Sequence, residues 1–243
     1  DCTLEPLGEG LTRLRQIKDQ DEIACLRQAQ RIAEEAFDAL LGQIKPGMQE
    51  KELAALLEYE MAKRGSERPS FDTILISGAK TSMPHGMPDT KPVAAGEFIL
   101  VDFGAVVNGY HSDMTRTFAL GSATERMRTV YSTVLAAQET GIRMLRAGIS
   151  CDQPHLAAHQ VIRDAGFGDC FGHALGHCVG LEIHESPALS PRAKQHLEPG
   201  MVITVEPGIY LPGEFGVRIE DLLLIQPDGA EDLTHTPKEL LIL

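Results

Sequence analysis

The sequence has no hydrophobic run long enough to cross a membrane and no cluster of basic residues. Of its 243 residues 43% are hydrophobic, but no apolar stretch approaches the ~20 residues that a membrane-spanning helix needs. Its 35 acidic residues exceed the 22 basic ones, so the formal charge is −13. Such a surface repels nucleic acids and anionic membranes. We therefore expect neither a nucleic acid nor a membrane as a partner.

Paired cysteines and a secretion signal are also missing. The N-terminus lacks the basic start and apolar centre of a signal peptide. The cysteines are odd in number and widely spaced, without a Cys-x-x-Cys pair, which suits a reducing compartment better than a disulfide framework. We expect free thiols and a cytoplasmic protein. The five cysteines are Cys2, Cys25, Cys151, Cys170 and Cys178.

The first half of the sequence predicts a pair of helices. Apolar residues recur at spacings of three and four from Asp21 to Ile44, as on one face of an amphipathic helix, and a Pro-Gly pair then stops the pattern. A second helix carries leucines at positions 53, 56 and 57 on one face, and Gly65 stands where a C-terminal cap is expected.

The second half predicts a similar pair. Ser122 to Glu125 has the pattern of a capping box that opens a long helix, ended near Gly148. A shorter helix starts at Asp152 and is closed by Gly166, and the closing glycines of both pairs recur at an offset of 101 residues. This predicts two related half-domains, residues 21–120 and 121–243, with a ligand site between them. The alternative is a coincidence between two common helix-pair patterns.

Three strand-like apolar runs are each interrupted by a carboxylate, at Asp102, Glu206 and Glu220. An ionised carboxylate removed from water costs several kcal/mol unless it is paired or holds a metal. Asp113 lies beside the first run in sequence, and histidines follow in the second half. Oxygen ligands with one imidazole are the set that hard divalent metals accept. The sequence therefore predicts a metallohydrolase.

Asn108-Gly109 between alternating residues predicts a two-residue type I′ hairpin turn. The turn fixes a register in which Asp102 faces Thr115, so Asp113 in the partner strand shares the face of Asp102. Both carboxylates can then reach one ion. Two alternatives remain open at this point: both aspartates are solvated, or Arg116 pairs with Asp113.

The carboxylates of the second half also have structural alternatives. Glu206 precedes a Pro-Gly turn, where catalytic side chains are often displayed, but it also suits an ordinary glutamate at a strand end. Glu220 and Arg218 lie two residues apart, so in a strand they share a face and can form a plain ion pair.

Four histidines complete the candidate site: His85, His173, His177 and His184. Alternation from residue 179 to 183 predicts a strand. Because His177 and His184 are an odd number of residues apart, either one of them lies where the chain bends, near Gly176, or the two histidines serve different roles. Each histidine taken alone also fits a hydrogen-bonded core residue. Cys178 is expected to be a bystander, because carboxylates favour a hard metal.

In order and wording, these residues resemble the pita-bread metallopeptidases, the family of Xaa-Pro aminopeptidase, prolidase and methionine aminopeptidase. The match covers about residues 23 to 243. Its six motifs are MPHG at 83–86, VDFGA at 101–105, HSDMTRTF at 111–118, HALGHCVGLEIHE at 173–185, EPGMVITVEPGIY at 198–210 and GVRIED at 216–221.

The resemblance implies an α+β pita-bread fold with two pseudo-symmetric αβ halves around a curved antiparallel sheet. It implies residues 21–243 as the catalytic domain and residues 1–20 as a residual linker from a missing N-terminal domain. It also implies two divalent ions, with manganese expected and cobalt, zinc or iron as alternatives. The implied metal ligands are Asp102, Asp113, His177, Glu206 and Glu220. The implied catalytic residues are His85, His184 and Glu206, and the implied substrate-binding residues are His85, His173, His184 and Arg218.

The resemblance further implies an exopeptidase that attacks Xaa-Pro peptides with a metal-bridging hydroxide. Some prolidases carry an arginine where this chain has Ala188, although Arg192 or Arg218 can substitute. We therefore expect an Xaa-Pro aminopeptidase that accepts longer peptides, and a homodimer is one expected state. The alternatives are a prolidase, a methionine aminopeptidase, a metal-free creatinase-like hydrolase and a non-catalytic binding module.

Overall fold

A computed structural model describes residue 8 and residues 10–243. The helices are α1 (Gly10–Gln16), α2 (Gln20–Leu41), α3 (Glu50–Lys63), α4 (Glu125–Met144) and α5 (Asp152–Asp164), with short 3₁₀ turns η1 (Gly78–Ser82) and η2 (Gly168–Cys170). The strands are β1 (Ile74–Ser77), β2 (Phe98–Phe103), β3 (Val106–Val107), β4 (Tyr110–His111), β5 (Met114–Ala119), β6 (Gly176–Cys178), β7 (Glu185–Leu189), β8 (Val202–Val205), β9 (Gly208–Leu211), β10 (Phe215–Arg218), β11 (Asp221–Gln226) and β12 (Gly229–Asp232).

The two predicted helix pairs are present, and one predicted helix start is wrong. Helix α2 begins with a capping box in which Asp19 accepts the Glu22 N–H and Glu22 reaches back to the Asp19 N–H. Helix α4 is capped by Thr124, whose hydroxyl accepts the Met127 N–H at 3.2 Å, so Ser122 is not its cap. Thr124 has the extended backbone that a cap needs.

The halves repeat each other in backbone hydrogen bonding as well as in helices. The N–H of Gly47 donates to the carbonyl of Val93 at 2.8 Å, and the N–H of Gly148 donates to that of Leu197 at 2.8 Å. Both glycines have positive φ angles, +93° and +79°, a conformation that glycine adopts without steric cost. The same loop therefore follows the first helix of each pair, 101 residues apart.

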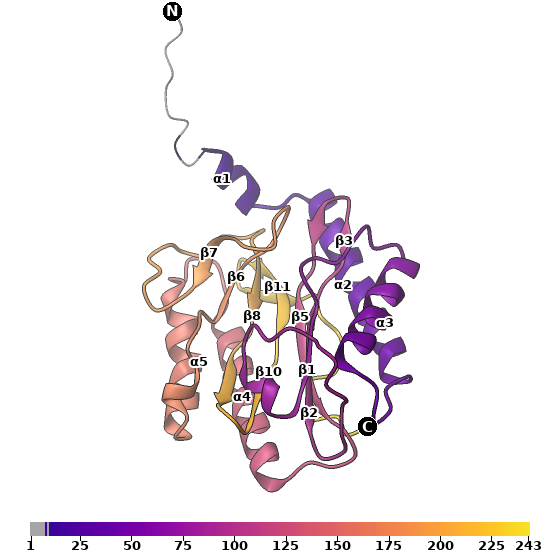
Figure 1. Ribbon diagram of the computed structural model, residues 1–243. Coiled ribbons are helices and arrows are strands. Elements are labelled where there is room, and N and C mark those ends of the chain that lie inside the picture. Colours follow the sequence, from indigo (N-terminus) through magenta and orange to yellow (C-terminus); the bar gives the residue numbers. More distant parts are fainter. Residues whose placement is uncertain (1–7, 9) are drawn as a thin grey trace, which may run out of the picture.

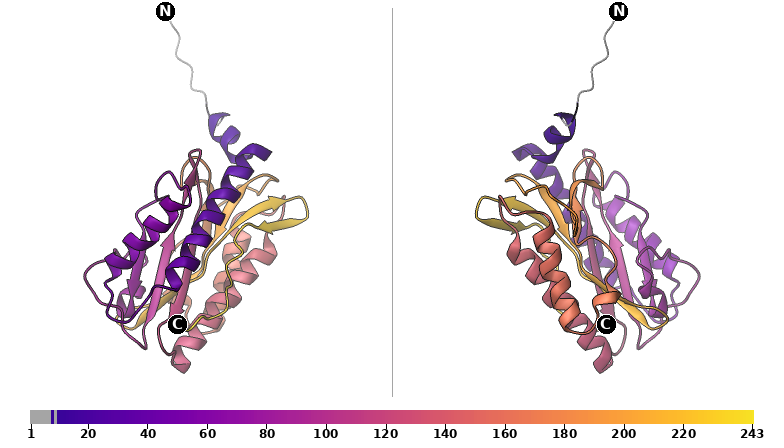
Figure 2. Two further views of the ribbon diagram at one scale, coloured as in Figure 1. Left: turned by 90° about the vertical axis from the view of Figure 1, so that its right-hand side faces the viewer. Right: turned by 90° about the vertical axis from the view of Figure 1, so that its left-hand side faces the viewer.

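All pairings between the named strands are antiparallel, and an isolated bridge from Ala119 of β5 to Ile242 is parallel. The first half forms a sheet in the order β1-β2-β5, and the second half forms one in the order β12-β11-β8-β6-β7. The hairpins β3-β4 and β9-β10 complete the two halves. Figures 1 and 2 show the strands between the helix pair α2-α3 and the helix pair α4-α5. This is the expected α+β arrangement of two αβ halves.

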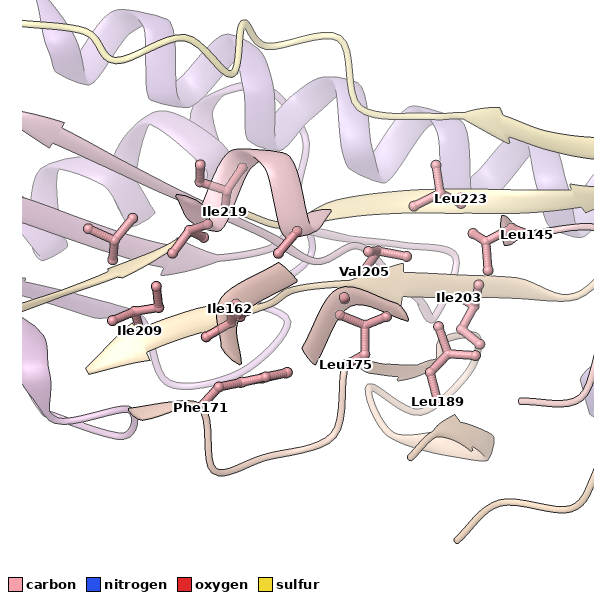
Figure 3. Close-up of a cluster of buried hydrophobic side chains, with 14 of the residues drawn as sticks. Leu145, Ile162, Phe171, Leu175, Leu189, Ile203, Val205, Ile209, Ile219 and Leu223 are labelled. Atoms are coloured by element: carbon pink, nitrogen blue, oxygen red, sulfur yellow. The ribbon is translucent and has the colours of Figure 1, made fainter. Parts of the chain in front are cut away.

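Each half also has its own apolar core. One cluster packs α2 and α3 on β2 and β5, and a second packs α4 and α5 on the strands of the other sheet. Figure 3 shows the second cluster, where Leu175, Ile203 and Leu223 meet from three different strands or loops. Burial of such side chains removes about 1.5–3 kcal/mol each of unfavourable hydration. Because the helices cover the outer side of each sheet, the strand ends and the breaks between strands face a cavity shared by the two halves.

Between residues 179 and 183 the predicted strand is wrong. The chain pairs regularly at His177, in β6, and resumes pairing at Glu185, in β7, with bends between them. The expected bend near Gly176 is present at Leu175, and further bends run from Gly180 to His184, where the chain reverses. The alternating apolar residues do not form one buried face, since Val179 is buried while Leu181 is 45% exposed.

None of the helices in residues 10–243 is long and apolar enough to cross a bilayer. Cys25, Cys151, Cys170 and Cys178 are free, and Cys2 lies outside the described residues. Of the expected linker 1–20, the described part holds α1 and the buried Lys18, while residues 1–7 and 9 lie outside it.

The close approach of β6 to β8 depends on Gly176. A Cβ atom at this position would lie 1.9 Å from the carbonyl oxygen of Thr204, so Gly176→Ala must separate the two strands. We expect a loss of about 2–4 kcal/mol in the free energy of unfolding, which lowers Tm by roughly 4–16 °C in a domain of this size. Thermal unfolding measures the effect. Gly172→Ala is the matched control, because a Cβ there meets nothing within 4 Å; equal Tm values for the two variants would contradict the prediction.

Candidate metal centre and substrate cavity

A cavity of about 610 Å³ lies between the two halves. All nine candidate site residues line it: His85, Asp102, Asp113, His173, His177, His184, Glu206, Arg218 and Glu220. Its walls also include apolar side chains, among them Phe71 and Ile74. Residues more than 130 positions apart in the sequence therefore meet in one place, as the repeat predicted.

The four carboxylates come from equivalent places in the two halves. Asp102 lies near the end of β2 and Glu206 directly after β8. Asp113 lies in the break between β4 and β5, and Glu220 lies in the break between β10 and β11. In each half, a hairpin separates the two carboxylates. The chain thus presents two acidic side chains from each half to the same cavity.

The hairpin turn at Asn108 and Gly109 has the predicted geometry, with φ angles of +49° and +79°. Asp102 lies opposite Thr115, as the turn predicted. The expectation that Asp113 belongs to a strand is wrong: it sits in an unpaired break just before β5. The break turns its side chain into the cavity, where it is 4% exposed.

His177 has a free lone pair that faces two carboxylates. Burial lowers its pKa to about 4, with a smaller effect from His184, so the ring is neutral. Its Nδ1 lies 3.1 Å from the carbonyl oxygen of Cys178, which can only accept, so the proton is on Nδ1. Nε2 is then an acceptor, yet it lies 3.5 Å from Asp113 Oδ2 and 3.4 Å from Glu206 Oε1. Three acceptors facing one point repel one another unless a proton or a cation lies between them.

The titration of the carboxylates supports the same conclusion. Burial and the nearby carboxylates of Asp102 and Glu206 raise the pKa of Asp113, and burial and Asp113 raise the pKa of Glu220. Burial also raises the pKa of Glu206, to about 8. One oxygen of Asp102 is buried without a hydrogen-bond partner. Ligand atoms of Asp113, His177 and Glu220 lie within 4.8 Å of one another. The donor set fits a divalent metal centre.

Arg218 pairs with Asp102 rather than with Glu220. Its Nη2 donates to Asp102 Oδ2 at 2.5 Å, and its Nε donates to the hydroxyl of Thr115 at 3.0 Å. Thr115 in turn donates to Glu220 Oε2 at 2.6 Å. The open alternative of a plain Arg218–Glu220 pair is therefore excluded by the observed partners, and Glu220 keeps one oxygen for another ligand.

Tyr210 is a residue of the site that the sequence reasoning missed. Its hydroxyl accepts from Arg218 Nη1 at 2.9 Å and lies 2.9 Å from His173 Nε2. Because His173 Nδ1 donates to the carbonyl of Ala174 at 2.8 Å, its Nε2 accepts the Tyr210 proton. His173 therefore forms a fixed wall of the cavity. The only signal in the sequence was the tyrosine that ends the motif EPGMVITVEPGIY.

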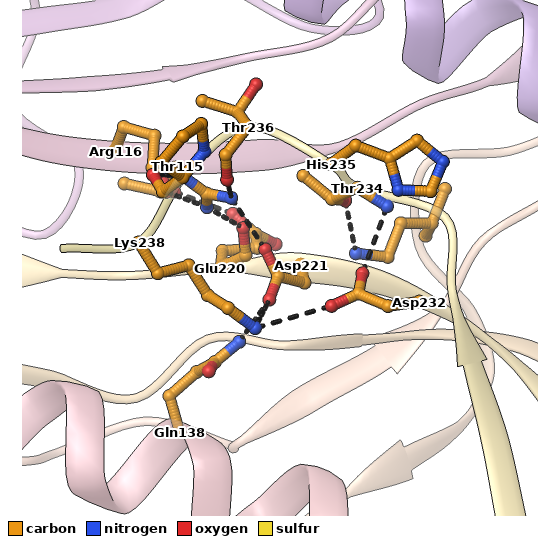
Figure 4. A network of polar contacts seen from close by, with 12 residues as sticks. Thr115, Arg116, Gln138, Glu220, Asp221, Asp232, Thr234, His235, Thr236 and Lys238 are labelled. Carbon is orange, nitrogen blue, oxygen red and sulfur yellow. Dashed lines mark hydrogen bonds and ion pairs between the residues drawn. The ribbon is translucent and has the colours of Figure 1, made fainter.

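Behind the cavity, a polar network holds the backbone at Glu220. Arg116 donates to the carbonyl of Glu220 at 2.6 Å and pairs with Asp221 Oδ1 at 2.8 Å, so the alternative pairing of Arg116 with Asp113 is excluded. Gln138 and Lys238 also donate to Asp221, each at 2.6 Å (Figure 4). Asp221 is fully buried, and its charge is balanced by these donors. The sequence reasoning did not assign this role to Asp221.

His85 and His184 lie on irregular segments rather than on strands. His184 approaches His177 with 4.4 Å between ring centroids, which brings it beside the proposed ligand atoms. His85 lines the cavity from the first half, after η1. Both are placed to offer an imidazole to a bound molecule.

Known proteins resemble this chain in sequence and in fold. The Xaa-Pro dipeptidase of Pyrococcus furiosus is 44% identical over 94% of the chain, and the chain spans 66% of its length, just under two thirds. The X-Pro aminopeptidase structure from Thermotoga maritima matches 98% of the chain and 67% of its own with a TM-score of 0.96 at 42% identity. The Xaa-Pro dipeptidase structure from Bacillus anthracis also has a TM-score of 0.96, at 43% identity, over 98% of the chain and 67% of its own.

These likenesses confirm the pita-bread fold expected from the motifs. The sequence model for metallopeptidase family M24 matches residues 24–227, which is most of the chain and includes all nine candidate site residues. Enzymes of this family use pairs of divalent metal ions. The chain belongs to metallopeptidase family M24.

Proposed function

We propose that this protein is an Xaa-Pro dipeptidase that releases proline from dipeptides. The observation that carries a metallopeptidase function is the neutral His177 with its lone pair aimed at the carboxylates of Asp113 and Glu206. The dipeptide preference is supported by relatives with that name at 42% to 44% identity, and it replaces our expectation of an aminopeptidase for longer peptides. An N-terminal exopeptidase for Xaa-Pro peptides stays the second candidate, favoured by Ala188 and by the Thermotoga maritima enzyme.

In this proposal, two divalent ions are held by Asp102, Asp113, His177, Glu206 and Glu220. When bound, such ions lower the pKa of a water molecule and polarise the scissile carbonyl. We propose manganese, with cobalt, zinc or iron as alternatives that the same donors accept.

The residues of the chain then bind the substrate and move protons. Glu206 takes the proton of the attacking water and returns it to the prolyl nitrogen, a role that suits a half-buried carboxylate lining the cavity. His184 stabilises the oxyanion and His85 orients the amide, since both rings line the cavity. His173 lines the proline pocket, and Arg218 orients Asp102, to which it donates.

Two further expectations remain proposals. We place the protein in the cytoplasm, supported by four free cysteines in the described residues. We also propose that it acts as a homodimer, and sedimentation of the purified protein tests this.

Metal binding is expected to stabilise the protein, because it relieves repulsion between buried carboxylates. At about 100 times Kd, Mn²⁺ adds about 2.7 kcal/mol to the free energy of unfolding, or roughly 5–10 °C in Tm. Glu220→Gln is expected to abolish this shift and to leave the Tm of metal-stripped protein equal or higher. The control Glu139→Gln, on the exposed face of α4, keeps the shift. A Glu220→Gln protein that is less stable without metal but still responds fully to Mn²⁺ would show that Glu220 is only structural.

Substrate length separates the two candidate functions. We expect metal-loaded protein to cleave Ala-Pro with a kcat/KM at least about tenfold above that for Ala-Pro-Ala, which corresponds to about 1.4 kcal/mol of differential transition-state binding. Met-Ala-Ala and Ala-Ala-Ala are expected to be poor substrates. Glu206→Gln is expected to lower kcat by at least about 100-fold, the usual contribution of a general base. Faster cleavage of Ala-Pro-Ala would establish the aminopeptidase instead, and no turnover with bound metal would indicate a binding role.

A further inference from the structure

The position of His184 depends on a loop with little backbone support of its own. Residues 180–184 form bends without strand pairing. Two backbone hydrogen bonds involve the loop, from Gly180 to the carbonyl of Glu182 at 3.1 Å and from His111 to the carbonyl of Gly180 at 2.9 Å. Side-chain contacts must therefore keep the ring of His184 beside His177.

The carboxylate of Glu185 lies at the centre of this loop. Its side chain is only 5% exposed, and it folds back over Gly180, where a Cβ atom would lie 2.6 Å from Oε2. The N–H of Glu182 points at Oε1 from 3.3 Å. Glu185 directly follows His184 in the chain. Contacts that hold the Glu185 carboxylate therefore also restrict the backbone of His184 and the position of its imidazole.

The positive charges that hold Glu185 come from the segment before α2. Lys18 Nζ lies 3.0 Å from Glu185 Oε2, and the Lys18 side chain is 1% exposed. Arg15 donates to Oε1 from Nη2 at 2.6 Å and from Nε at 3.2 Å. Arg15 also contacts Glu182 at 3.3 Å, on the same loop. A charge this deeply buried stays ionised only with such partners.

The same segment is tied to the strand that leads to Glu206. The backbone N–H of Lys18 donates to the carbonyl of Gly200 at 2.9 Å, in the turn before β8. A second, smaller cavity of about 190 Å³ lies between α1 and the loop, and His184 and Glu185 line both cavities. The loop therefore separates α1 from the substrate cavity, and residues in and just after α1 hold it in place.

We propose that Lys18 and Arg15 are positioning residues that hold His184 in place through Glu185. Buried ion pairs add little net stability compared with apolar packing, so stability alone is a weak reason for this arrangement. The part of this inference that is tested by kcat rests on the proposed function. The stability of the loop 180–185 can be measured by hydrogen exchange without any turnover.

The test compares Lys18→Met and Arg15→Gln with Lys18→Arg, which keeps the charge. The control is Arg27→Met, which removes a bidentate pair with Glu231 away from both cavities. In metal-loaded protein with Ala-Pro as substrate, we expect Lys18→Met to lower kcat by about tenfold or more and to change KM by less than about threefold. Arg15→Gln, whose side chain is 37% exposed, is expected to fold and to have a smaller effect. Lys18→Arg is expected to restore most of kcat, and Arg27→Met to leave it unchanged.

A double-mutant cycle with His184→Ala separates positioning from general destabilisation. If Lys18 acts through His184, Lys18→Met is expected to change kcat by less than about twofold once His184 is gone. Hydrogen exchange of metal-stripped protein gives an independent measure: amides 180–185 are expected to exchange about tenfold faster in Lys18→Met, and those of α4 to stay unchanged.

These measurements also separate this inference from the proposed function. If the wild-type protein cleaves no Xaa-Pro dipeptide, the proposed function fails, and loop exchange alone decides the positioning role. Equal exchange in the wild type and Lys18→Met would overturn the inference. So would a loss of kcat that is just as large in the His184→Ala background. If Lys18→Met does not fold, the same comparisons with Arg15→Gln decide.

Discussion

The mutual repulsion of four carboxylates, two of them buried and two half-buried, is the constraint that the rest of the structure accommodates. Asp102 alone has a guanidinium partner, and no Lys or Arg in the described residues lies within ion-pair distance of Asp113, Glu206 or Glu220. Their positions are fixed by strands that pack on helices, so they cannot move apart to reach water. A cluster of this kind is stable only when it is protonated or shares cations, and the unprotonated Nε2 of His177 favours cations.

The internal repeat explains how one chain brings these groups together. In each half, two strands enclose a hairpin, and one carboxylate precedes the hairpin while another follows it. In each half the strand register already sets both carboxylates on one face, since Asp102 lies opposite Thr115, two residues from Asp113, and the pairing of Val205 with Asp221 places Glu206 beside Glu220. Because the helices pack on the outside of each half, the inner faces are free to form a polar cavity between them.

Local chemistry made parts of this arrangement predictable from the sequence. The Asn108-Gly109 turn allows few backbone geometries, so it fixed which residue lies opposite Asp102. Amphipathic spacing placed the helices, although the cap of α4 was misassigned because Ser122 and Thr124 are both good capping residues and only backbone conformation distinguishes them. Carboxylates inside apolar runs identified the metal site because burial of an unpaired charge is so unfavourable.

Long-range partners were not predictable in this way. Arg218 had a glutamate two residues away, yet it pairs with Asp102 from the other half, 116 positions earlier. Alternation after His177 indicated a strand, but the chain bends there, with the Glu185 carboxylate over Gly180 and Lys18, 167 positions away, compensating its charge. Such contacts depend on how the two halves pack together. The pattern of residues in a short stretch of sequence cannot predict them.

The charge of the cavity connects the metal site to substrate length. In the proposed enzyme, two divalent cations match the charge of four carboxylates, and the buried guanidinium of Arg218 leaves the cavity with surplus positive charge. Electrostatic attraction is strong in such a partly desolvated space. A dipeptide brings its own carboxylate to within one residue of the scissile bond, whereas a longer peptide carries that charge farther away. In the proposed enzyme, the attraction for the carboxylate of a dipeptide would come from Arg218, which lines the same cavity as Ala188 and pairs there with Asp102.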